Sequence, residues 1–148
     1  MEAPRRRACL ILALAALAGC GGSDDRQTAS CKVDRGVLPA WARTGFSEAE
    51  PKMPHVVGDD GRIAAVLFGD PLLAPPDPDR ANKILWVARE TPQPPARLTI
   101  RAQQGDRTLT RTVDVGPSSV DLPQGCWHLE LSWTGGGHDT LDLAYEKQ

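Results

Sequence analysis

Several features that would identify a function directly are missing from this sequence of 148 residues. With 17 basic and 19 acidic residues the formal net charge is only −2, so there is no cationic excess with which to hold nucleic acid. No apolar run reaches the 18 or more residues of a membrane-spanning helix. A phosphate-binding glycine loop, a Gly-x-Ser-x-Gly nucleophile elbow and a Cys-x-x-Cys pair are also absent. We therefore expect no nucleic-acid partner and no cofactor.

What the sequence does have, at its start, is the layout of an export signal. Three arginines at positions 5–7 precede an apolar run from Ala8 to Ala18, which is too short to span a membrane. The sequence Leu-Ala-Gly-Cys follows at positions 17–20. This order closely resembles the signal peptide and lipobox of bacterial lipoproteins. The resemblance implies removal of residues 1–19 and acylation of Cys20 as the mature N-terminus. The alternative is an ordinary secretory signal with a chance cysteine.

The resemblance places the protein in the cell envelope. A lipidated Cys20 would hold it to the outer face of the cytoplasmic membrane or to an outer membrane, and two or three acyl chains make a stable anchor. Losing three of 17 basic and one of 19 acidic residues with the signal peptide moves the net charge from −2 to −4. Anionic headgroups repel such a domain, so the lipid, not the surface, is the expected anchor. Small polar residues at 20–30 are typical of a flexible tether.

Four cysteines are present, and two are left once processing is taken into account. Cys9 would leave with the signal peptide, and Cys20 would carry lipid, so Cys31 and Cys126 remain. Export puts them in an oxidising compartment, where two leftover cysteines usually pair. A bridge closing a loop of about 95 residues stabilises by about 4–5 kcal/mol in the chain-entropy model. A metal or redox pair is the alternative.

The rest of the chain is typical of an all-β domain. Residues 31–53 indicate an irregular segment packed on the domain, with a helical turn near residues 40–43, and residues 54–148 indicate the domain itself. Regularly spaced β-type runs without helical periodicity predict an antiparallel, immunoglobulin-like β-sandwich of about seven strands. The expected strands cover residues 63–68, 83–88, 96–102, 107–115, 118–122, 126–133 and 140–145. The first two are continuous apolar runs, which predicts cover on both faces.

The last strands carry a second resemblance. The sequence from Gly116 to Tyr145, GPSSVDLPQGCWHLELSW followed by DTLDLAY, is similar to the closing strands of immunoglobulin-like bacterial envelope domains. Alternation in residues 126–133 puts Trp127 on the apolar face and Cys126 on the other. The Cys31–Cys126 pair is therefore expected to be a peripheral staple, unlike the core disulfide of antibody domains.

Two features suggest a binding surface. Trp41 and Phe46 lie outside any strong strand pattern, and they favour either an exposed platform for sugars or a partner protein, or a lid on the end of the sandwich. Asp77 and Asp79 lie in a proline-rich loop that superficially resembles a calcium loop. That loop lacks the usual glycine and distal glutamate, which favours a plain acidic loop.

The histidines do not have the spacing of a metal site. His55, His128 and His138 form no i, i+2 or i, i+4 pair, which favours scattered surface positions over zinc ligation. A Ser–His–Asp set assembles in space rather than along the sequence and stays open at this point.

The sequence predicts a monomeric, non-enzymatic binding or interaction module whose partner is an envelope protein or glycan. Such a module would use loops at one end of the sandwich, chiefly 70–82, 91–95 and 134–139. A protease-inhibitor-like module, a small hydrolase or metal-dependent enzyme, and an accessory subunit of an envelope complex are the alternatives.

Overall fold

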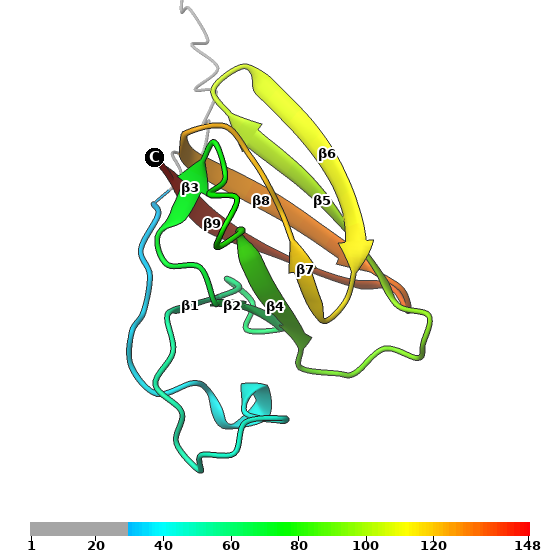
Figure 1. The fold of residues 1–148 in the computed structure, drawn as a ribbon. Coiled ribbons are helices and arrows are strands. Elements are labelled where there is room, and N and C mark those ends of the chain that lie inside the picture. Colours follow the sequence, from blue (N-terminus) through cyan, green and yellow to red (C-terminus); the bar gives the residue numbers. More distant parts are fainter. Residues whose placement is uncertain (1–29) are drawn as a thin grey trace, which may run out of the picture.

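A computed structural model describes residues 30–148 (Figure 1). The predicted signal peptide, the lipidation site Cys20 and most of the tether lie outside these residues. One short 3₁₀ helix, η1, and nine strands follow one another along the described chain. Their bounds are η1 (Ala40–Ala42), β1 (His55–Val57), β2 (Ile63–Leu67), β3 (Leu72–Ala74), β4 (Lys83–Ala88), β5 (Arg97–Gln104), β6 (Arg107–Asp114), β7 (Pro117–Ser119), β8 (Gly125–Trp133) and β9 (Gly137–Lys147).

The strands form two sheets that pack face to face as a sandwich. One sheet has the order β1-β2-β4-β7 and the other the order β3-β9-β8-β5-β6. Every named pairing is antiparallel except that of β3 with β9. By chain order and pairing, β2-β4-β7 correspond to strands A, B and E of the immunoglobulin fold, and β5-β8-β9 to strands C, F and G. The all-β, immunoglobulin-like prediction is confirmed.

All seven expected strands are present, as β2 and β4–β9, and two short ones are added. β1 and β3 have three residues each, too few for alternation to indicate a strand. β3 lies inside the expected loop 70–82, where it pairs with the end of β9, Leu72 opposite Tyr145. β4 also differs from expectation, because its burial alternates, with only Ile84, Trp86 and Ala88 fully buried. One face of β4 is therefore less covered than the apolar run suggested.

Alternate residues of the facing strands fill the core between the sheets. Trp86 and Trp127 are each at most 1% exposed, and Trp133 closes one end of the core at 8%. The indole of Trp127 donates a hydrogen bond to the Pro123 carbonyl at 2.7 Å. The hydroxyl of Tyr145 donates to the Val120 carbonyl, also at 2.7 Å. Both polar atoms are thereby paired, as burial requires.

The irregular segment at residues 31–53 covers the outer face of the four-stranded sheet. Ala64 and Val66 of β2 alternate with core residues and so face away from the core, yet both are fully buried. The segment runs beside β1, where Asp34 forms a backbone bridge with His55. Its own buried residues, Leu38 and Ala42, supply apolar cover. This explains why β2, unlike β4, is buried on both faces.

The described chain starts at one end of the five-stranded sheet. Cys31 is disulfide-bonded to Cys126 near the start of β8, and the Ser30 N–H donates to the Asp142 carboxylate at 2.5 Å. Cys126 alternates with the core residue Trp127, so the bridge is peripheral as expected. We call this end, where β3 and the C-terminus also lie, the tether end (Figure 1). From there β8 runs nine residues to Trp133, a span of roughly 26 Å at about 3.3 Å per residue.

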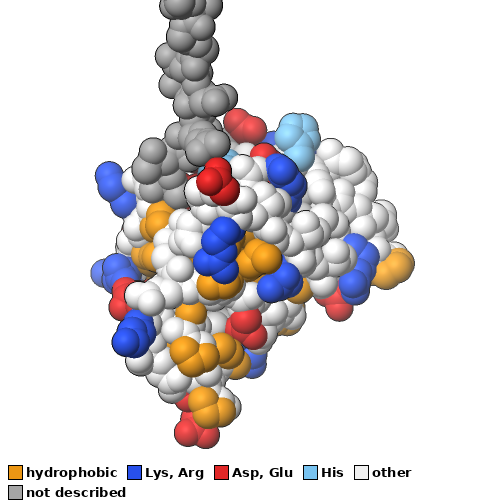
Figure 2. All heavy atoms as spheres, turned by 90° about the horizontal axis from the view of Figure 1, so that it is seen from above, with side chains coloured by type: hydrophobic (Ala, Val, Ile, Leu, Met, Phe, Trp, Pro, Cys, Tyr) orange, Lys and Arg blue, Asp and Glu red, His pale blue; other side chains and the backbone are white. Residues whose placement is uncertain are grey.

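Charges are mixed on the face that Figure 2 presents. Lys and Arg side chains alternate over it with Asp and Glu, and neither sign forms a continuous patch (Figure 2). Among residues 30–148, the only helix is the three-residue η1, and no helix is long and apolar enough to cross a membrane.

A candidate binding pocket at the loop end

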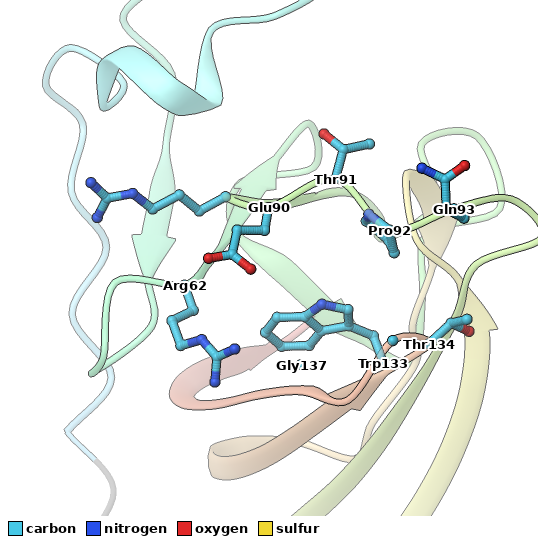
Figure 3. A pocket seen from close by; sticks show the side chains of 10 residues that line it. Arg62, Glu90, Thr91, Pro92, Gln93, Trp133, Thr134 and Gly137 are labelled. Carbon is cyan, nitrogen blue, oxygen red and sulfur yellow. The ribbon is translucent and has the colours of Figure 1, made fainter.

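A pocket of about 270 Å³ opens at the end of the sandwich opposite the tether end. It lies where the β1–β2 turn, the β4–β5 loop and the β8–β9 turn meet (Figure 3). We call it the end pocket. It is lined by Arg62, Arg89, Glu90, Thr91, Pro92, Gln93, Trp133, Thr134, Gly135 and Gly137.

Arg62 and Trp133 form one wall of the end pocket. The Arg62 guanidinium carbon lies 5.9 Å from the centroid of the Trp133 ring, within cation–π range. Its Nη1 donates to the His138 carbonyl at 3.2 Å. The indole nitrogen of Trp133 faces the loop that carries Thr91 and Pro92 (Figure 3). The wall thus combines a cation with an N–H donor.

The opposite rim carries a second arginine–tryptophan pair and a carboxylate. Arg89 lies 6.0 Å from the ring centroid of Trp41, the η1 tryptophan. The next residue, Glu90, directs its carboxylate into the hollow, toward Arg62 and Trp133 (Figure 3). Within the described chain Glu90 has no ion-pair partner at 4.0 Å or less. The end pocket therefore holds the cation of Arg62 and the carboxylate of Glu90, which no salt bridge within residues 30–148 neutralises, while the Arg89 guanidinium lies over Trp41 on the rim.

A buried aspartate fixes the β1–β2 turn against the β8–β9 turn. Asp139 is 3% exposed and accepts backbone N–H bonds from Asp60 at 2.9 Å, Arg62 at 2.8 Å and Thr140 at 2.8 Å. A Cβ on Gly58 would lie 2.2 Å from this carboxylate, so the position requires glycine. Because Asp139 holds the backbone of Arg62, it positions that side chain at the pocket.

Gly137 makes room for the tryptophan wall. A Cβ at this position would lie 2.0 Å from the Trp133 ring, closer than atoms of neighbouring side chains approach. Trp133 can lie against the β8–β9 turn only because Gly137 has no side chain.

No protein-family model, curated protein or solved structure matches this chain. The chemistry of the site is therefore argued from its own residues.

Two of the three loops expected to form one binding end do so. Residues 91–93 line the end pocket together with Thr134, Gly135 and Gly137. The loop 70–82 does not join them, because β2 leads into it and β4 leads out of it at the tether end. That expectation is wrong, since the first and last residues of a loop between antiparallel strands share one end of the sheet.

The proposed acidic residues lie in this distant loop. The Asp77 carboxylate accepts the Asp79 N–H at 2.8 Å, an arrangement typical of an Asx turn. Residues 30–148 contain no group of three or more His, Cys, Asp or Glu placed to hold a metal ion.

The structure separates the two proposed aromatic residues. Trp41 stacks with Arg89 beside the end pocket, whereas Phe46 stacks on Phe68 with ring centroids 6.5 Å apart. Phe68 is 48% exposed. Trp41 therefore lies beside the loop end of the sandwich, and Phe46 lies beside the residue that follows β2.

The three histidines lie on different parts of the sandwich. His55 is buried in β1, where its Nδ1 lies 2.7 Å from the Met53 carbonyl oxygen. His128 lies on the outer face of the five-stranded sheet, 2.7 Å from the Asp142 carboxylate. His138 is opposite Ser132, four residues along β8 from His128, which separates the two by roughly 13 Å. His128 and Asp142 form a His–Asp pair.

Three site residues were not named as candidates from the sequence. Arg62 and Glu90 directly follow a turn and a strand, and Asp139 closes a glycine-rich turn. A charged residue at a strand end is commonly just solvated, so each one alone carried no signal. Only the pairing of β2 with β4 and of β8 with β9 brings these positions to one end.

Proposed function

We propose that this protein is an envelope lipoprotein whose β-sandwich is a non-enzymatic binding module, with the end pocket as its ligand site. The observation that carries the proposal is the pocket itself, where Arg62, Glu90 and Trp133 converge from three separate connections. Loops on a rigid sandwich are the usual place for recognition, and concave sites with a few convergent polar groups are typical ligand sites.

The position of the pocket supports this role. Residue 30, the last of the expected tether, is hydrogen-bonded to Asp142, which pairs with His128 in the half of β8 nearer the tether end. The end pocket lies at the other end of β8. If Cys20 carries the lipid, the domain would present the pocket away from its anchor. The mixed charges in Figure 2 fit an anchor that depends on lipid rather than on a basic surface.

The anchor is tested by the intact mass of the protein from native membranes. We expect a mass that lacks residues 1–19 and carries acyl chains, with two hydrogens gained on reduction of Cys31–Cys126. A Cys20→Ala variant should lose the lipid mass. An unlipidated wild-type protein would contradict the lipoprotein proposal while leaving the pocket proposal to its own test.

The binding role is tested by photo-crosslinking in cells. A photoreactive residue at Gln93, on the pocket rim, should give an adduct that weakens when Arg62→Gln and Glu90→Gln are added. The matched control is the same residue at Thr108, which is exposed near the tether end of β6. Equal adducts at both positions, or none at Gln93, would contradict the binding role of this pocket.

A further inference from the structure

We infer that the end pocket binds a uronic acid residue, a sugar ring that carries a carboxylate, within an acidic envelope polysaccharide. This inference rests on the binding function proposed above and specifies its ligand. It is argued from three properties of the pocket: its polar lining, its charge and its size.

The lining suits a ligand rich in hydroxyl groups. Pro92 and Trp133 are the large apolar side chains of the lining. Six other side chains there are charged or carry hydrogen-bonding groups, namely Arg62, Arg89, Glu90, Thr91, Gln93 and Thr134. An apolar ligand would leave these groups unpaired, at a cost in affinity. A sugar ring offers hydroxyl donors and acceptors in several directions, so it can pair with groups that converge from different loops.

Arg62 is suited to the carboxylate. A guanidinium has five N–H donors, and in Arg62 only Nη1 is engaged with His138, through its carbonyl and its ring Nδ1. The remaining fork matches a carboxylate in the bidentate geometry typical of arginine. Because Trp133 supports the guanidinium and Asp139 fixes the backbone of Arg62, little ordering is required when the ligand binds.

Glu90 selects against a purely anionic ligand such as phosphate. Its carboxylate faces the hollow and would repel a second anion placed close to it. An ionised carboxylate accepts hydrogen bonds, and sugar hydroxyls donate them. The indole N–H of Trp133 supplies a donor on the other side of the hollow. The ligand must therefore present an acid at one edge and hydroxyls at another, as a uronic acid does.

The size of the pocket matches one sugar unit. Its volume of about 270 Å³ is slightly below the usual range of ligand pockets, which is about 300–1,000 Å³. One ring would occupy it while the rest of the polysaccharide lies outside. We therefore expect modest affinity per site.

The test is calorimetric titration of the full-length protein, purified from membranes in detergent, with digalacturonic acid. The matched ligand is the same disaccharide with both carboxyl groups reduced to alcohols. We expect the acidic disaccharide to bind at least tenfold more tightly and to weaken as salt is added. Equal affinity for the two disaccharides would overturn the inference without any variant.

Two variants locate the contacts. Arg62→Gln should weaken binding of the acidic disaccharide about tenfold and leave the reduced one nearly unchanged. Glu90→Gln should weaken binding of the reduced disaccharide, because one of two accepting oxygens becomes an amide donor. It should weaken binding of the acidic disaccharide less, because it also removes a charge that repels the ligand carboxylate. The control is Arg107→Gln, since Arg107 also stacks on a tryptophan, 5.3 Å from the ring centroid of Trp127, but lies outside the end pocket.

The outcomes separate the ligand from the function. A Gln93 crosslink that depends on Arg62, together with no binding of digalacturonic acid, would overturn the uronic acid inference and keep the binding function. If neither the Gln93 crosslink nor binding of digalacturonic acid were seen, the uronic acid inference and the binding function would both be overturned. If the Arg62→Gln protein bound the acidic disaccharide as tightly as the wild type, Arg62 would not be the residue that binds the carboxylate of the disaccharide.

Discussion

At the residue scale, the most informative side chains are polar groups that are buried and paired. Tyr145 and Asp139 are both under 4% exposed, and each holds together segments distant in sequence. A buried donor or acceptor that loses its hydrogen-bond partner destabilises the folded state by about 1–3 kcal/mol, which is more than a typical surface ion pair contributes. Their loss is therefore measurable in unfolding experiments.

Tyr145 makes the stability of the fold sensitive to alkaline pH. Burial, together with the negative charge of Asp121, raises the pKa of the Tyr145 phenol above its ordinary value of about 10. The neutral phenol is favoured in the folded state, so its contribution is complete below pH 10 and is lost as pH rises above 10 toward the folded pKa. Tyr145 is the only tyrosine, so tyrosinate absorbance reports on it alone.

We expect the contribution of Tyr145 to the free energy of unfolding to decrease only above about pH 10. In a Tyr145→Phe variant that alkaline component should disappear, while stability at pH 7 falls by about 1 kcal/mol through loss of the bond to Val120. Tyrosinate absorbance that rises at pH 10 before unfolding would contradict the burial argument.

Asp139 is expected to couple stability to ligand binding. In Asp139→Asn, one oxygen that accepts backbone N–H groups is replaced by an amide donor, so at least one of the bonds from Asp60, Arg62 and Thr140 is lost. We expect the free energy of unfolding in urea to fall by about 1–3 kcal/mol. Binding at the end pocket should weaken as well, since the turn that carries Arg62 is loosened. Asp79→Asn, in the exposed part of the loop 70–82, is a matched substitution outside these contacts.

At the scale of single elements, β6 requires explanation because it is a long edge strand. It pairs with β5 over eight residues and ends its sheet. Unprotected edges of this length recruit further strands. Leu109 and Val113 of β6 pack against the core, so by alternation Arg107 and Arg111 lie on the same inner side. Inward-pointing charges on an edge strand oppose pairing with a second copy.

We expect Arg111→Val to promote self-association, because it removes a charge from this edge and raises strand propensity. It also frees the Thr110 carbonyl, to which Arg111 donates at 3.0 Å. Sedimentation velocity should show concentration-dependent dimers for this variant and a monomer for the wild type. Thr112→Val, on the outer face, also places valine in the strand but keeps the Arg111 charge, so this variant should stay monomeric. If the two variants behaved alike, propensity rather than charge would control the edge.

Elements differ in how far their sequence determines them. β5 and β8 were predictable because eight or nine residues of alternation select one face, and burial follows that pattern. β3 was not, because three residues between prolines carry no period and its partner, the end of β9, is about seventy residues away. For the end pocket, the sequence predicted the two loops at 91–95 and 134–139. It did not predict Arg62, which is brought beside them only by the pairing of the strands.

At the scale of the whole molecule, the disulfide joins the start of the described chain to the sandwich. It connects residues 95 apart in sequence, so in the chain-entropy model it stabilises by about 4–5 kcal/mol. We expect a Cys31→Ser/Cys126→Ser protein to lose up to that amount in urea unfolding. The wild type under reducing conditions should match it. A loss well under 1 kcal/mol would mean that the unfolded chain is already compact without the bridge.

The same bridge has a mechanical consequence. If the lipid holds the protein at its N-terminus and a ligand pulls at the end pocket, force enters at Cys126 and leaves near Trp133, so it runs along β8. β8 is an inner strand, paired with β5 and β9 on its two sides. Tension along β8 then loads many backbone hydrogen bonds in shear at once. The chain between Cys31 and Cys126 carries no load, because the disulfide connects its two ends. Single-molecule pulling between residues 30 and 134 should give a lower rupture force once the disulfide is reduced, since the load then passes through the 31–53 cover.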